Sequence, residues 1–83
     1  MAIDYSKLRG LTVRELVTAL KRDGFIPERS KGATRLFCHP DGRRVIIHEH
    51  RPGQTLKIGT LKEIMENEAL WDEHDLKRLK LLK

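Results

Sequence analysis

The sequence predicts an α+β fold, a three-stranded antiparallel sheet set between helices, with a short helix at the C-terminus. Helical patterns of apolar residues occur near both ends of the chain, alternating segments occupy the middle, and a Pro-Asp-Gly turn signal separates the last two of these segments. Strands grouped between helices are typical of one sheet with helices on one face and the other face open. No repeat or linker divides the chain, so we expect a single domain over residues 1–83.

The first helix is predicted to begin at Thr12. The segment Thr12-Val13-Arg14-Glu15 has the spacing of a capping box, in which the threonine hydroxyl and the glutamate carboxylate bind the first free amides of a helix. Apolar residues then recur at helical spacing, and the stripe consists of Val13, Leu16, Val17 and Leu20. Gly24 is expected to end the helix. Residues 1–10 are expected to form an N-terminal extension.

Three strands are predicted from residue 25 to residue 50. The first covers Phe25 to Arg29 and is expected at an edge of the sheet, because Pro27 cannot donate a ladder hydrogen bond. The second runs from Thr34 to His39 and the third from Arg43 to His50, joined by Pro40-Asp41-Gly42. Alternation places Val45 and Ile47 on one face of the third strand and Ile46, His48 and His50 on the other. The second face mixes apolar and polar residues, as a functional face would.

Two further helices are predicted. Thr60-Leu61-Lys62-Glu63 repeats the capping-box spacing, so a helix is expected to start there and to bury Leu61, Ile64 and Met65. Residues 71–83 are expected to form a helical tail that Asp72 caps. Its apolar side would consist of Leu76, Leu79, Leu81 and Leu82.

Composition narrows the class of protein. The chain has 83 residues and a formal net charge of +5, which favours a polyanionic partner. Its single cysteine, Cys38, excludes an internal disulfide framework and favours a reducing compartment. There is no apolar run of the ~20 residues needed to span a bilayer, and the N-terminus lacks a signal pattern. We therefore expect a cytoplasmic location and no membrane partner.

Several motifs resemble the HicA family of toxins, which are mRNA interferases with a double-stranded-RNA-binding-domain-like fold. The similarity covers roughly Leu11 to Lys83. It rests on Glu15-Leu16-Val17, Asp23-Gly24-Phe25, His39-Pro40-Asp41-Gly42-Arg43-Arg44-Val45, His50 and Gly59-Thr60-Leu61. The resemblance implies the toxin of a type II toxin-antitoxin pair, a HicB-type antitoxin as partner, and metal-independent cleavage of mRNA without a cofactor.

The sequence departs from this family at the expected catalytic residue. The family carries a Gly-Ser-His segment after the first strand, where this chain has Gly32-Ala33-Thr34. Attack by a ribose 2′-hydroxyl requires a base to take its proton, and imidazole suits that role whereas a threonine hydroxyl does not. Thr34 can still bind a phosphate oxygen or a ribose hydroxyl. RNA binding is thus expected to survive, and cleavage requires another residue.

Other histidines are candidates for the missing proton carrier. The family resemblance favours His50, which shares a strand face with His48, and then His39, which could equally serve only to hydrogen-bond the hairpin. His74 lies among acidic residues and is expected on the surface. His48-Glu49-His50 offers two imidazoles on one face, but zinc usually requires more ligands, so we expect no metal. Cys38 is expected to be half-buried and structural.

Basic residues concentrate around the strands and are expected to bind RNA phosphates. They are Lys31, Arg35, Arg43, Arg44 and Arg51. The chain has few aromatic residues, so recognition would depend on shape and phosphate rather than on base stacking. Three functions remain open: an RNA-cleaving toxin with a reassigned histidine, a non-catalytic RNA-binding module, and a module that binds only its antitoxin.

Overall fold

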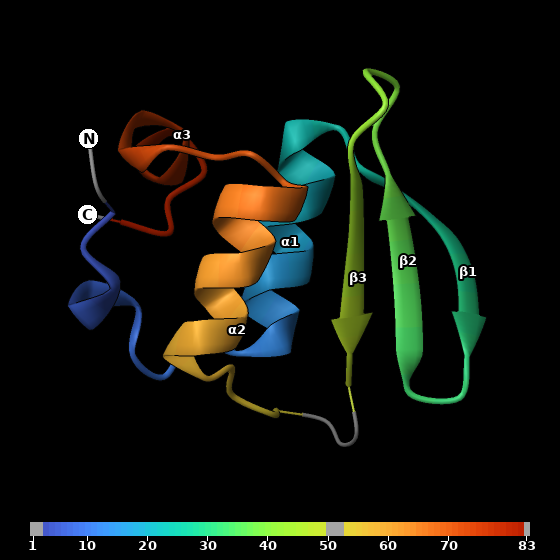
Figure 1. The fold of residues 1–83 in the computed structure, drawn as a ribbon, viewed down its shortest axis with the longest axis horizontal. Helices are drawn as coiled ribbons and strands as arrows, with labels where there is room; N and C mark the ends of the chain where they lie inside the picture. The colour runs from blue at the N-terminus through green and yellow to red at the C-terminus, as the bar shows by residue number, and fades with distance from the viewer. Residues whose placement is uncertain (1–2, 50–52, 83) are drawn as a thin grey trace.

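The computed structural model describes residues 3–49 and 53–82 and places the helices to one side of a three-stranded sheet (Figure 1). The elements in chain order are η1 (Tyr5–Leu8), α1 (Val13–Asp23), β1 (Ile26–Lys31), β2 (Thr34–Cys38), β3 (Arg44–His48), α2 (Ile58–Glu63), η2 (Ile64–Glu68) and α3 (Glu73–Arg78). η1 is a 3₁₀-helix, and η2 is a π-helical turn that continues α2. The predicted α+β class and its double-stranded-RNA-binding-domain-like α-β-β-β-α order are confirmed.

Helix α1 begins and ends where the sequence predicts. The Thr12 hydroxyl accepts from the Glu15 amide at 3.2 Å, and the Glu15 carboxylate accepts from the Thr12 amide at 3.2 Å. Gly24 closes the helix with a φ of 103°, in the left-handed region that favours glycine. A Cβ atom at Gly24 would also lie 3.0 Å from the His39 ring. Both the turn and the close packing therefore require glycine here.

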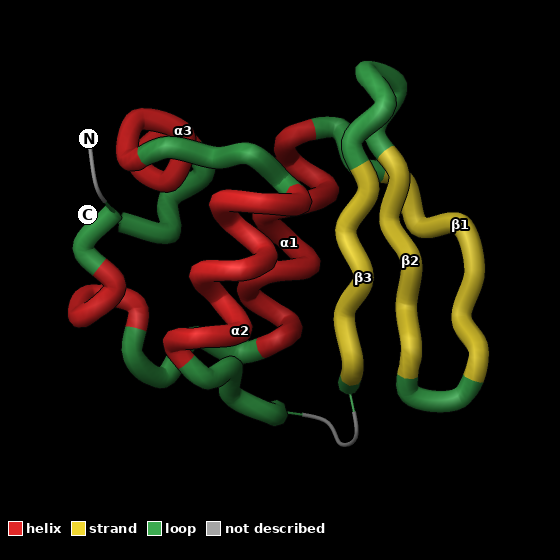
Figure 2. Tube along the Cα trace, in the orientation of Figure 1, coloured by secondary structure: helices red, strands yellow, loops and turns green. Residues whose placement is uncertain are grey.

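The sheet has the order β1-β2-β3, and both strand pairs are antiparallel. β1 is an edge strand, as Pro27 predicts, and its register with β2 shifts between Pro27 and Arg29. The predicted start at Phe25 is wrong by one residue, because Phe25 turns inward and is only 2% exposed. Figure 2 shows β3 nearest to the helices and β1 farthest from them.

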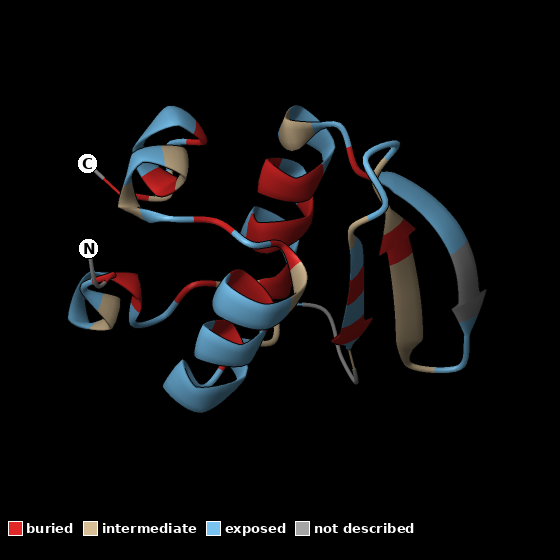
Figure 3. Ribbon diagram, turned by 45° about the horizontal axis from the view of Figure 1, so that its top comes forward, coloured by how far each residue is buried: buried red, intermediate tan, exposed pale blue. Residues whose placement is uncertain are grey.

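The two faces of the sheet differ as the alternation predicts. Val45 and Ile47 of β3 are buried, whereas Arg44, Ile46 and His48 are exposed. Figure 3 shows the same alternation as stripes along β3. The predicted third strand is longer than β3 at both ends, and His50 lies outside the described residues.

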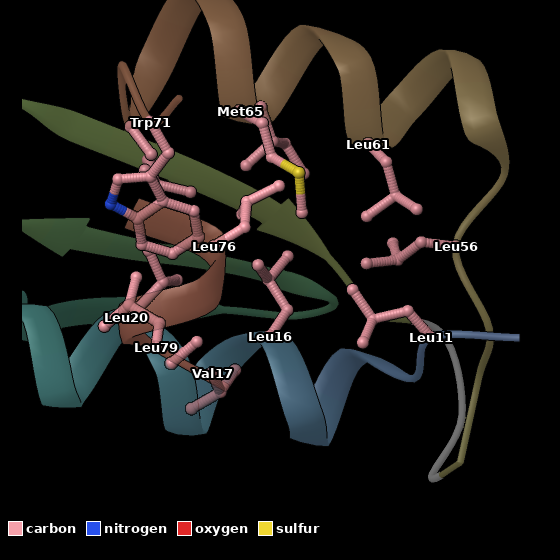
Figure 4. Close-up of a cluster of buried hydrophobic side chains, with 14 of the residues drawn as sticks. Leu11, Leu16, Val17, Leu20, Leu56, Leu61, Met65, Trp71, Leu76 and Leu79 are labelled. Atoms are coloured by element: carbon pink, nitrogen blue, oxygen red, sulfur yellow. The ribbon is translucent and has the colours of Figure 1, made fainter. Parts of the chain in front are cut away.

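The core lies between α1, the continuous α2–η2 helix, α3 and the inner face of the sheet. Figure 4 shows Leu16 and Leu20 of α1 facing Leu61 and Met65 of the α2–η2 helix, with Leu76 of α3 nearby. All five side chains are fully buried. Burying a side chain of this size stabilises the fold by roughly 1.5–3 kcal/mol, so these contacts are the main source of stability.

The predicted start of the second helix at Thr60 is wrong. α2 begins at Ile58, its N-cap is Lys57, and no side chain caps it. The reason is a long-range contact that sequence spacing does not reveal. Thr55 forms a bridge with Thr12, and the Leu56 amide donates to the Leu11 carbonyl at 3.0 Å. Leu56 is thereby fixed in the core, and the chain turns into the helix directly after it.

The C-terminal tail packs onto the core. Asp72 caps α3 as predicted, and Asp75 completes a capping box with it. Leu76, Leu79 and Leu82 are buried, while Leu81 is half-buried. At the other end of the chain, Leu8 of η1 is also buried. The tail and the N-terminal segment lie close together beside the helices (Figure 1).

Candidate functional site

Thr34 lies at the start of β2, directly across from His48 of β3 and Lys31 of β1. The Thr34 hydroxyl and Nδ1 of the His48 ring are 3.3 Å apart, within hydrogen-bond distance. The His48 side chain is exposed, and Thr34 is half-buried. The position where the family resemblance predicts a histidine therefore carries a hydroxyl that contacts an imidazole on the neighbouring strand.

The Thr34–His48 pair belongs to the face of the sheet that points away from the core. We define the outer sheet face by alternate residues of β2 and β3: Thr34, Leu36, Cys38, Arg44, Ile46 and His48. Its middle is apolar, since Ile46 is 46% exposed and sits across from Leu36. Its margins are polar, with His48 at one end and Arg44 at the other. Cys38 is half-buried, as predicted.

A groove runs between β3 and α2 and has a volume of about 630 Å³. We name it the β3–α2 groove. Its strand side consists of Arg44, Ile46 and His48, and its helix side consists of Gly59, Thr60, Glu63, Ile64 and Glu68. Glu68 links the two sides of the groove, because its carboxylate accepts from the Ile46 amide at 2.9 Å. His48 is the imidazole that lines it.

His39 lies beyond the opposite end of β2 and β3 from His48. Its Nε2 lies 2.7 Å from the Asp23 carbonyl, and its Nδ1 lies 3.1 Å from the Asp41 amide. The carbonyl can only accept, so Nε2 carries a proton, and Nδ1 also lies 3.0 Å from a carboxylate oxygen of Asp41. The ring also packs edge-on against Phe25. Both nitrogens of His39 are thus occupied by hydrogen bonds that hold the hairpin against α1.

The predicted RNA-binding residues lie in different surroundings. Lys31 and Arg44 are exposed. Arg35 forms an ion pair with Glu49 at 3.2 Å and lies over the Phe37 ring, on the inner face of the sheet. Arg51 and His50 lie outside the described residues.

Arg43 is held within the protein. It forms ion pairs with Asp23 at 3.1 Å and Asp41 at 2.7 Å, and its side chain is only 18% exposed. It also donates to the Ala69 carbonyl and lies 5.0 Å from the centre of the Phe25 ring. The cationic cluster predicted from the sequence is therefore divided, with Lys31 and Arg44 available to a ligand and Arg35 and Arg43 neutralised by internal partners.

Asp23 is a residue whose importance the sequence did not indicate. Its carboxylate accepts from Trp71 at 2.9 Å and from Arg78 at 2.7 Å, and its side chain is only 8% exposed. Burial would raise the pKa of this carboxyl, but the hydrogen bonds from Trp71 and Arg78 and the charges of Arg43 and Arg78 lower it below its ordinary value. Asp23 therefore stays ionised and joins three segments of the chain.

His48 is the site residue that sequence reasoning missed as a candidate in its own right. The sequence shows that His48 alternates with residues of the buried face and shares the other face with Ile46. Its contact with Thr34, however, depends on the register between β2 and β3, which a single sequence does not determine. A signal that could have found it is the shared distance of Thr34 and His48 from the Pro40-Asp41-Gly42 turn, since equal distances from a hairpin turn place residues opposite one another.

The structure also bears on metal and membrane binding. Across residues 3–49 and 53–82, no group of three or more histidine, cysteine or acidic side chains is arranged to hold a metal ion. None of the helices in the same part of the chain is long and apolar enough to cross a bilayer.

Comparison with known proteins identifies the family. The model of a family described as "HicA toxin of bacterial toxin-antitoxin" matches residues 13–69, from the first residue of α1 to Ala69, the C-cap of the π-helical turn. A search of curated proteins found no match. The family match covers more than half of the 83 residues and includes the whole sheet, the β3–α2 groove and the Thr34–His48 pair. The chain therefore belongs to the HicA toxins, the toxin components of bacterial toxin-antitoxin pairs.

Proposed function

We propose that this toxin binds RNA across its outer sheet face and cleaves mRNA as a metal-independent endoribonuclease in the cytoplasm. The observation that carries the proposal is the Thr34–His48 pair on an open sheet face, with Lys31 exposed on the neighbouring strand β1 and Arg44 exposed at the far end of β3. A hydroxyl and an imidazole can form hydrogen bonds with ribose and phosphate groups. Lys31 and Arg44 can bind neighbouring phosphates of the same RNA chain.

A HicB-type antitoxin is the partner that we propose for the same face. The outer sheet face exposes Ile46, and the neighbouring edge strand exposes Ile26, which is 56% accessible. A protein that covers these apolar residues would at the same time exclude RNA from Thr34 and His48. The family membership supports an antitoxin partner, and its identity as HicB is part of the proposal.

The alternative is a module of the same fold that binds RNA, or only its antitoxin, without cleaving RNA. Thr34 favours this alternative, because a threonine hydroxyl does not exchange protons near neutral pH as an imidazole does. General acid-base assistance is typically worth ~10²–10⁴-fold in rate, and this is the activity that would be lost.

RNA binding is tested with charge reversals on the outer sheet face. Lys31→Glu combined with Arg44→Glu should weaken the affinity for RNA at least ~10-fold for all sequences, and each lost phosphate contact should reduce the salt slope by about one. The matched control is Arg14→Glu combined with Lys21→Glu, which changes the net charge equally on exposed positions of α1. An unchanged affinity in the first variant would reject the proposed RNA surface.

Cleavage is tested on a long RNA at neutral pH in the presence of EDTA. The proposal predicts RNA products from the wild-type protein. RNA binding without products would select the non-catalytic module. Tight antitoxin binding by a free chain that binds no RNA would select the protein-interaction module.

A further inference from the structure

We propose that His48 is the catalytic base of RNA cleavage in this chain and that Thr34 is its positioning residue. The inference rests on the proposed function and assigns its chemistry to a specific pair of side chains. It differs from the sequence-based candidates: His39 has both ring nitrogens occupied, and His50 lies outside the described residues.

The strand register places the two side chains together. Thr34 and His48 are cross-strand partners on the outer sheet face, at a pair that exchanges no backbone hydrogen bonds, where side chains come closest. The next pair along the ladder is Ala33 and Glu49, whose backbone bond of 2.7 Å continues the ladder past His48. The side-chain amide of Gln54 donates to the His48 carbonyl at 3.2 Å and holds the end of the strand. His48 is therefore exposed but well positioned.

The contact with Thr34 occupies Nδ1 of His48 and leaves Nε2 to face a ligand. When Nδ1 of His48 carries the proton, it donates to the Thr34 hydroxyl, and the lone pair of Nε2 is free to accept a proton. Within the described residues, Nε2 of His48 has no hydrogen-bond partner. After Nε2 has accepted a proton, Nδ1–H still donates to Thr34. The hydroxyl thus supports both the base and the imidazolium that it becomes.

The β3–α2 groove provides room for a ribonucleotide next to His48. Its volume of about 630 Å³ falls in the range of ~300–1,000 Å³ that is common for small-molecule sites. Its helix side carries the carboxylates of Glu63 and Glu68, which would repel a phosphate from the interior of the groove. The phosphate is therefore expected outside the groove, on the outer sheet face toward Thr34 and Lys31, with the ribose inside the groove.

In the proposed reaction, His48 accepts a proton from the ribose and later returns it to the solvent. The 2′-hydroxyl of the ribose gives its proton to Nε2 of His48, and the 2′-oxygen forms a bond to the adjacent phosphorus. The bond from phosphorus to the 5′-oxygen of the next nucleotide breaks, and that oxygen takes a proton from water. The imidazolium returns its proton to the resulting hydroxide. The products are a 2′,3′-cyclic phosphate and a 5′-hydroxyl end.

The primary test compares His48→Ala with His74→Ala, which removes an exposed imidazole from α3. Cleavage of a fluorescent RNA should fall ~10²–10⁴-fold in His48→Ala and stay within threefold of wild type in His74→Ala. Binding of a non-cleavable 2′-O-methyl RNA should be unchanged in His74→Ala, and in His48→Ala it should fall far less than cleavage does. Because the His48 side chain is exposed, both variants should fold, and circular dichroism would verify this.

Thr34 is tested by its own pair of variants. Thr34→Val removes the hydroxyl while keeping the shape, and the cleavage rate should fall ~10-fold. Thr34→Ser restores a hydroxyl and should restore most of the rate, which a merely structural role would not require.

The outcomes distinguish this inference from the proposed function. Wild-type cleavage that persists in His48→Ala would overturn the role of His48 and leave the endoribonuclease intact, with His50→Ala as the next variant. RNA binding without any wild-type cleavage would overturn both the base and the enzyme. Products with a 5′-phosphate would also overturn the inference, because they require attack by water rather than by the ribose.

Discussion

The carboxylate of Asp23 joins parts of the chain that are far apart in sequence. It lies at the end of α1, and it binds Arg43 from the hairpin and Trp71 and Arg78 from the C-terminal segment. Its side chain is almost fully buried, so these partners replace the water that it has lost. A single residue thus determines how the hairpin and the tail approach the first helix.

Removing this carboxylate should destabilise the protein substantially. Asp23→Ala leaves the largely buried guanidinium of Arg43 without its inner partner, and breaking such a pair typically costs about 3 kcal/mol. A chain of this size has a free energy of unfolding of about 4–12 kcal/mol, so urea denaturation should show the loss clearly. The control is Glu28→Gln at an exposed position of β1, which should change the midpoint little.

The same residue predicts a pH dependence of stability. The folded pKa of Asp23 is lower than its ordinary value of 3.8, so its contribution is fully present above that value and is lost as the pH falls through the folded pKa. Asp23→Asn keeps the shape and removes the charge. The stability difference between wild type and Asp23→Asn should therefore be constant from about pH 7 to pH 5 and shrink below about pH 4. A difference that stays constant down to about pH 2 would contradict this assignment.

The sequence correctly predicted those features that depend only on residues close together in the chain. The cap at Thr12, the stop at Gly24 and the alternation along β3 each depend on neighbours within a few positions, and all are confirmed. The surroundings of Arg43 could not be predicted, because its main partner Asp23 is twenty residues away and approaches only in the folded chain. Charge alone does not distinguish a ligand-binding cation from one held by internal carboxylates.

At the scale of elements, the two Thr-x-x-Glu segments show what such a motif can and cannot establish. The segment at Thr12 caps α1, whereas the one at Thr60 lies inside α2, where Thr60 lines the β3–α2 groove instead. The difference arises from the bridge between Thr12 and Thr55, which fixes where the chain enters α2. Spacing predicts that a helix exists, and tertiary contacts decide where it begins.

The different roles of Thr12 and Thr60 should appear as different changes in the free energy of unfolding. Thr12→Ala removes a capping hydroxyl and should lower the free energy of unfolding by about 1 kcal/mol. Thr60→Ala removes a hydroxyl of the same type from the interior of a helix, where alanine is favoured, and should have little effect or a small stabilising one. Equal losses in the two variants, measured by urea denaturation, would indicate that Thr60 acts as a cap in solution.

At the scale of the whole molecule, the described fold extends beyond the segment that defines the family. The family match ends at residue 69, yet Trp71, Leu76 and Leu79 belong to the same core as α1. Arg78 adds a 2.7 Å ion pair with Asp23, inside the matched segment. The tail is therefore expected to be necessary for stability, although the proposed RNA surface lies on the sheet.

The tail's contribution should appear as a loss of stability without a loss of RNA affinity. Leu79→Ala removes a buried side chain and should cost about 3 kcal/mol, with RNA affinity at low temperature within twofold of wild type. Lys80→Gly in the same tail should stabilise the protein, because Lys80 has a φ of 65° that glycine adopts without strain. The free energy of unfolding should rise by about 1 kcal/mol. If Leu79→Ala instead weakened RNA binding while leaving the unfolding midpoint unchanged, the tail would have to contact RNA directly, and the proposed binding surface would have to extend from the sheet to α3.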